Sequence, residues 1–170
     1  MTLDLIKYLK GGDLRSNAKA KELATLIETQ YDFNALFHFL HSKDRLLIMR
    51  AADVLEKISR GHPNYLWPHQ RDILHFLKTA KHKEFKWHLA QMVGRLPLTP
   101  IQRLEVSDVL TSWVTDSSES KIVRVNALQA LYDINKQYHE REGEIQELIR
   151  NLKKEKIPSL ISRIRKLTSS

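Results

Sequence analysis

Three polar side chains recur at one position of an internal pattern and could together line a binding surface. Arg50, His88 and Asn126 follow one another at intervals of 38 residues, each beside a stripe of apolar residues. A row of such groups would offer hydrogen bonds to a bound macromolecule. The alternative is structural: Arg50 would bridge neighbouring repeats through Asp44 or Asp53, with its aliphatic stem packed on apolar groups. The structural interpretation is the simpler one, and the spacing alone leaves both open.

Other residue patterns that could support catalysis or metal binding are incomplete. The chain has no cysteine, which excludes disulfides, thiolate zinc sites and cysteine nucleophiles. His38 and His41 are three residues apart, but no third ligand lies near them in the sequence. The stretch KGGD (10–13) lacks the spacing of a phosphate-binding loop, and no serine sits in a nucleophile elbow. We therefore expect no cofactor, no metal site and no catalytic residue.

Positive charge is concentrated at the C-terminal end of a chain whose formal net charge is +8. Residues 150–170 contain seven Lys and Arg and one acid, Glu155, whereas residues 104–149 are net acidic. The basic segment could contact phosphates, or it could form the polar outer face of a capping helix. Its candidate binding residues are Lys153, Lys154, Arg163 and Arg165, and a second basic set comprises Lys78, Lys81, Lys83 and Lys86.

The elements that must position these residues form a repeat. The segments RAADVLEKI (50–58), HLAQMVGRL (88–96) and NALQALYDI (126–134) align, and their apolar residues share one helical face. Leu55, Val93 and Leu131 are equivalent core positions. Strand patterning is absent, and Thr99 is an expected N-cap before Pro100. The expected helices span 3–10, 14–29, 33–41, 44–60, 67–80, 83–96, 99–115, 119–139, 142–153 and 158–167.

The repeat resembles a known family. KIVRVNALQALYDI (121–134) resembles the HEAT repeat consensus, and DRLLIMRAADVLEKI (44–58) and GGDLRSNAKAKELATLI (11–27) are similar to it. MRAADVLEKISRGHPNYLWPH (49–69) is also similar to a group of small bacterial HEAT-repeat proteins. The resemblance implies an all-α fold, a right-handed α-solenoid of about five HEAT-like helical hairpins, in one domain over 1–170. In such folds the second helices of the hairpins line a concave surface.

A second resemblance concerns the segment SWVTDSSESKIVR (112–124), which is similar to part of the HEAT-like alkylpurine DNA glycosylases. It implies an aromatic residue, Trp113, beside an aspartate, Asp116, whose carboxylate would stabilise positive charge developing on the sugar or orient a water molecule. The simpler interpretation is that Asp116 is a turn or N-cap residue, because TDSSES has the composition of a loop.

We expect a non-catalytic scaffold or adaptor that binds a protein partner through the concave helical surface. The alternative is a nucleic-acid-binding protein, with glycosylase chemistry as its enzymatic extension. No signal peptide or membrane span is recognised, so a cytoplasmic location is expected. The sequence leaves the oligomeric state open. Trp67 is expected to have a packing role and not a binding role. The candidate binding residues are Arg50, Trp87, His88, Arg95, Asn126, Lys153, Lys154, Arg163 and Arg165.

Overall fold

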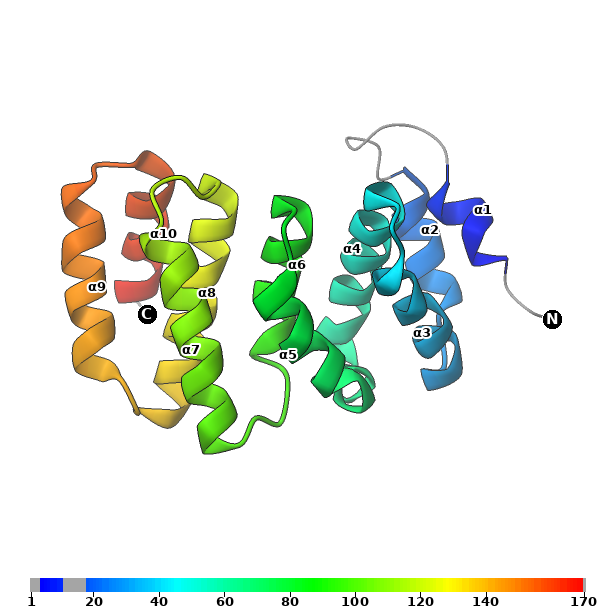
Figure 1. Ribbon diagram of the computed structural model, residues 1–170, viewed down its shortest axis with the longest axis horizontal. Coiled ribbons are helices and arrows are strands. Elements are labelled where there is room, and N and C mark those ends of the chain that lie inside the picture. The colour runs from blue at the N-terminus through cyan, green and yellow to red at the C-terminus, as the bar shows by residue number, and fades with distance from the viewer. Residues whose placement is uncertain (1–3, 11–17, 170) are drawn as a thin grey trace. The chain divides into compact units, whose positions relative to one another are not determined.

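The computed structural model describes residues 4–10 and 18–169, and this part of the chain contains helices and no strands. The chain divides into two compact units, Met1–Asp72 and Ile73–Ser170 (Figure 1). The expected turn at Gly11–Gly12–Asp13 and the first residues of the helix expected over 14–29 lie outside the described residues. The fold is therefore all-α, as predicted, and the single-domain assignment remains a prediction.

The first unit is built around one long helix, α4 (Arg45–Gly61), which packs against every other helical element of the unit apart from the start of α5. Two consecutive alanines and other apolar side chains give α4 a face that is fully buried. Asp44 caps the helix by accepting hydrogen bonds from the backbone N–H groups of Leu46 and Leu47. The elements around it are α1 (Leu5–Leu9), α2 (Ala18–Leu26), α3 (Gln30–Phe37) and the 3₁₀ helices η1 (His38–His41) and η2 (Pro63–His69).

The second unit has the same design around α8 (Lys121–Tyr138), which packs against four neighbouring helices. Within this unit α8 lies between α6 and α10, and α9 lies beside α10 (Figure 1). Phe76 of α5 contacts Phe85 of α6, with ring centroids 5.2 Å apart. The other helices of this unit are α5 (Gln70–Thr79), which begins in the last residues of the first unit, α6 (Lys83–Val93), α7 (Pro100–Thr115), α9 (Glu142–Lys154) and α10 (Pro158–Thr168).

The predicted repeat register is confirmed by burial. Leu55, Val93 and Leu131 have exposed fractions of 0%, 0% and 1%. Large apolar side chains at equivalent positions can be this well hidden only if each repeat presents the same helical face to its neighbours. The predicted cap of α7 is also present: Thr99 accepts from the N–H of Gln102, and the Gln102 side chain accepts from the N–H of Thr99.

The structure corrects four of the expected helices. The helix expected over 14–29 ends at Leu26, and the helix expected over 83–96 ends at Val93. The helix expected over 33–41 begins at Gln30, where Thr29 and Asp32 form a capping box, and residues 38–41 form a 3₁₀ turn. The helix expected over 67–80 begins at Gln70, because residues 63–69 form a 3₁₀ helix that contains Pro68. Trp67, which was expected to pack, keeps half of its surface exposed and is therefore covered only in part. A 3₁₀ helix has three residues per turn, so its side chains do not continue the register of the following α-helix.

Candidate binding surface

Polar side chains from three adjacent helices of the second unit are joined by hydrogen bonds. Gln91 of α6 donates from Nε2 to Oδ1 of Asn126 on α8 at 3.0 Å. Arg163 of α10 donates from Nη1 to Oε1 of Gln129 on α8 at 2.8 Å. Gln129 in turn donates to the Asp133 carboxylate at 2.9 and 3.0 Å. We call these five residues the polar ladder. These hydrogen bonds hold the five side chains in fixed orientations across the face formed by α6, α8 and α10.

Trp87, His88 and Arg95, all predicted from the sequence, lie on or just after α6 in this unit. Trp87 and Arg95 are partly exposed, whereas His88 is buried, with an exposed fraction of 6%. The Trp87 and His88 rings are tilted against each other at 5.4 Å. Asn126 donates to the carbonyl of Ile122 at 2.8 Å and is only partly exposed. Trp87 lies one helical turn before Gln91 on α6, so its partly exposed ring is on the same side of α6 as the polar ladder.

Arg50 belongs to the first unit and is buried, with an exposed fraction of 5%. Its Nη1 donates to the carbonyl oxygen of Leu9, the last residue of α1, at 2.8 Å. This carbonyl is one of the last in its helix, which have no partner within the helix. Arg50 thus ties α4 to the end of α1. A side chain buried in this way offers little surface to a ligand.

Arg124 is the most deeply buried charged residue of the described chain, with an exposed fraction of 1%. Its Nε donates to the Val114 carbonyl near the end of α7 at 2.7 Å, and its Nη2 donates to both carboxylate oxygens of Glu155 at 2.8 Å. Glu155 follows directly after α9. One arginine on α8 therefore joins the C-terminal ends of α7 and α9.

The basic residues predicted to contact phosphates separate into two environments. Lys153, Lys154 and Arg165 are exposed, and Lys154 donates to the side chain of Asn151 at 3.0 Å. Arg163 is only partly exposed and belongs to the polar ladder. The second basic set is partly neutralised: Lys78 pairs with Glu105 at 2.7 Å, and Lys86 pairs with Glu119.

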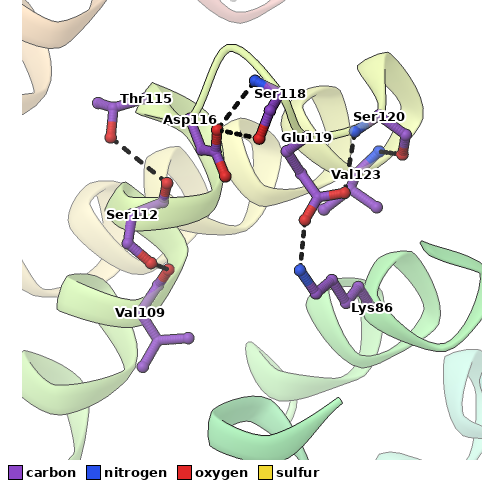
Figure 2. Close-up of polar contacts among 9 residues, drawn as sticks. All are labelled: Lys86, Val109, Ser112, Thr115, Asp116, Ser118, Glu119, Ser120 and Val123. Carbon is purple, nitrogen blue, oxygen red and sulfur yellow. Dashed lines mark hydrogen bonds and ion pairs between the residues drawn. The ribbon is translucent and has the colours of Figure 1, made fainter. Parts of the chain in front are cut away.

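The turn between α7 and α8 contains Asp116, and its contacts are those of a turn residue (Figure 2). The Asp116 carboxylate accepts from the backbone N–H of Ser118 at 2.8 Å and from its hydroxyl at 2.6 Å. These hydrogen bonds from Ser118 lower the pKa of Asp116 below its ordinary value. Trp113 is buried, and the Lys86 ammonium lies 5.3 Å from the centre of its ring. A buried indole offers no face on which a base could stack.

The histidines that suggested a metal pair have other neighbours. The rings of His38 and His41 are 6.1 Å apart, and His41 Nε2 lies 3.7 Å from a carboxylate oxygen of Asp72. No group of three or more potential ligand side chains able to hold a metal ion occurs in the described residues. His69 stacks on Phe37 at 3.8 Å, and its Nε2 lies 2.7 Å from the amide oxygen of Asn34.

Two functional candidates, Gln91 and Gln129, were missed by sequence reasoning. They occupy equivalent positions of the repeat, three residues after His88 and Asn126, and this 38-residue recurrence was visible in the sequence. The ion pairs between helices could not be recognised from a recurrence of this kind in the sequence. Arg103 pairs with Glu140 and lies 3.9 Å from the Tyr138 ring, and Arg141 pairs with Asp108 at 2.5 Å. Only the packing of α7 against α8 and the α8–α9 loop brings these residues together.

Successive helical hairpins with equivalent core positions and a buried arginine between helices define an α-helical repeat protein. A family model described as a HEAT repeat domain matches residues 13–170. The chain belongs to the HEAT repeat family. No curated protein and no solved structure gave a match. In the part of the chain that the structure describes, no helix is both long and apolar enough to pass through a lipid bilayer.

Proposed function

We propose that the chain is a non-catalytic scaffold that binds a protein partner through the face formed by α6, α8 and α10. The observation that carries this proposal is the polar ladder, whose cross-helix hydrogen bonds hold Asn126, Gln129 and Arg163 in place. Side chains already fixed in the free protein lose less conformational entropy when a partner binds. HEAT repeats also supply extended surfaces of this kind.

The composition of the face fits a protein partner better than a nucleic acid. It combines a partly exposed tryptophan, Trp87, with an arginine, Arg163, and these two residue types are enriched among the energetic anchors of protein interfaces. Asp133 is exposed on the same face and would repel a phosphate. The amides of Asn126 and Gln129 can exchange hydrogen bonds with a peptide backbone.

Photo-crosslinking tests this proposal. A benzophenone amino acid replaces Trp87 in one variant and Leu104, an exposed residue of α7, in a matched control. We expect a protein from the native host to be crosslinked through position 87 and not through position 104. The affinity of that purified protein should then fall at least about fivefold in Arg163→Ala, because losing an interface anchor costs roughly 1 kcal/mol or more.

Two outcomes would contradict the scaffold proposal. Equal crosslinking from both positions would mean that the face is not selective. Excision of a methylated purine by the wild-type protein, abolished in Asp116→Asn, would favour the enzymatic alternative. We expect Asp116→Asn to leave any activity unchanged, because an asparagine keeps the side-chain oxygen that accepts from Ser118.

A further inference from the structure

The C-terminal end of the second unit carries a set of exposed cations. They lie in the last two turns of α9, in the loop that follows, and in the last turns of α10. All are exposed, and we call them the basic edge: Arg150, Lys153, Lys154, Lys156, Arg165 and Lys166. Within residues 4–10 and 18–169, no carboxylate forms an ion pair with Arg150, Lys153, Lys154, Lys156 or Arg165.

The only acid of residues 150–170 is engaged in another interaction. Both carboxylate oxygens of Glu155 accept from Nη2 of the buried Arg124 at 2.8 Å. Lys156, directly after Glu155, has a positive φ of 55°, which marks a sharp change of chain direction at this point. Glu155 is thereby neutralised by a charge inside the fold, while the neighbouring lysines remain in solvent. The second basic set differs, because Lys78 and Lys86 are paired with acids.

The apolar side of α10 argues against a lipid surface as the ligand of this edge. Leu160, Ile164 and Leu167 are buried against the rest of the second unit. An interfacial membrane helix must instead present its apolar face to the acyl chains. The basic edge could therefore meet anionic headgroups only through charge, without insertion.

The absence of aromatic residues around the basic edge further limits the class of partner that it can bind. Residues 142–169 contain no Phe, Trp or Tyr. Single-stranded nucleic acid is usually held by stacking its bases on aromatic side chains, and protein partners are usually anchored by buried aromatic residues. Cations without such anchors suit the phosphate backbone of a duplex, which binds mainly through charge.

We propose that the basic edge binds the phosphate backbone of double-stranded nucleic acid without reading its base sequence. The cations flank α10 at both ends, and a helix of eleven residues is roughly 16 Å long. This separation is comparable to the width of the major groove, about 12 Å, so cations at the two ends can contact phosphates of both strands. This proposal goes beyond the scaffold function, because Lys153, Lys154 and Arg165 are not part of the polar ladder.

Fluorescence anisotropy with a labelled duplex of arbitrary sequence tests the proposal at several salt concentrations. The test variant is Lys153→Gln, Lys154→Gln and Arg165→Gln combined. The control variant combines Lys43→Gln, Lys121→Gln and Lys136→Gln, three exposed cations that belong neither to the basic edge nor to the second basic set. Both variants lower the net charge of +8 by the same three charges. Circular dichroism establishes that both remain folded, as expected for surface substitutions.

We expect the wild-type protein to bind the duplex with an affinity that falls steeply with salt. In the test variant the slope of log affinity against log salt should shrink by up to about 0.9 for each contact removed. The control variant should keep a slope close to that of the wild type. Three results would overturn the proposal: no binding of the duplex at low salt, equal losses in both variants, or a preference for polyglutamate or phosphatidylserine vesicles over the duplex.

Discussion

Two arginines show how a charged residue can be part of a repeat core. Arg50 donates to the carbonyl of Leu9, and Arg124 donates to the carbonyl of Val114 and to Glu155. In both cases a guanidinium on a central helix satisfies a carbonyl near the end of a neighbouring helix. The guanidinium is suited to this because it has several donors in a rigid plane and stays charged when buried.

Removing the Arg124 guanidinium should weaken the fold. In Arg124→Met the side chain keeps much of its apolar stem, but the Val114 carbonyl loses its donor and Glu155 loses its counter-ion. An unsatisfied buried acceptor costs about 1–3 kcal/mol. With the lost ion pair, we expect the free energy of unfolding to fall by about 2–4 kcal/mol, less than for a pair with both partners buried, because Glu155 is partly solvated.

Urea denaturation followed by circular dichroism measures this effect. Arg165→Met is the matched control, since Arg165 is an exposed cation of the same unit. Its free energy of unfolding should change by no more than about 0.5 kcal/mol. If Arg124→Met behaved like the control, Arg124 would have no structural role.

At the scale of the element, each unit depends on one central helix. The α4 helix contacts α1, α2, α3, η1 and η2, and α8 contacts α6, α7, α9 and α10. Their core positions are occupied by alanine and leucine or valine, where small residues let the helices approach and larger ones fill the space between them. A defect in a central helix should therefore affect its whole unit.

Leu55→Ala tests the role of α4. Leu55 is fully buried, so the substitution removes apolar contacts and leaves a cavity. We expect a loss of about 2–5 kcal/mol in the free energy of unfolding. Leu26→Ala on α2 is the control, because 37% of Leu26 is exposed. Chemical denaturation should show the smaller loss for Leu26→Ala; similar losses for the two variants would mean that α4 is not central to its unit.

At the scale of the whole molecule, acid should act on the fold in two steps. Burial lowers the pKa of His69 below its usual 6.5. The charge of Asp72 acts against this shift, whereas the charge of His41 adds to it. A lowered pKa means that the folded state binds the proton less readily than the unfolded chain. The contribution of neutral His69 to stability is therefore complete when the pH is above the pKa of histidine in the unfolded chain. This contribution is lost as the pH falls below that pKa.

The second acid step involves carboxylates. Hydrogen bonds from Thr29, Ser118 and Arg103 lower the pKa values of Asp32, Asp116 and Glu140, respectively. Their ordinary values are 3.8 for aspartate and 4.5 for glutamate, so their stabilising effect should disappear only below these values. All three are solvent-accessible, so screening by salt should make each contribution small.

The measurement is the urea midpoint between pH 8 and pH 3. We expect a first decrease as the pH falls from about 7 to about 5, and a second below about 4.5. In His69→Phe the aromatic stack on Phe37 can persist while the titrating group is gone, so the first decrease should be smaller. An unchanged first decrease in this variant would assign the effect to another histidine.

The repeat, the helical class and the core register could be deduced from the sequence by itself. Apolar residues recurring at 38-residue intervals can be buried only if each repeat forms the same helices, so periodicity alone predicts that Leu55, Val93 and Leu131 lie in the core. Local capping signals act over three or four residues, which is why Thr99 was recognisable as the N-cap of α7.

The pairing of polar side chains was decided only by the tertiary structure. The bond from Arg124 to Glu155, the ladder from Gln129 to Arg163, and the ion pair between Lys86 and Glu119 each join residues more than thirty positions apart. The physical reason is that hydrogen bonds require an approach of about 3 Å in a suitable direction, whereas periodicity only assigns a residue to a helical face. These pairings also determine which cations remain exposed and can contact a partner.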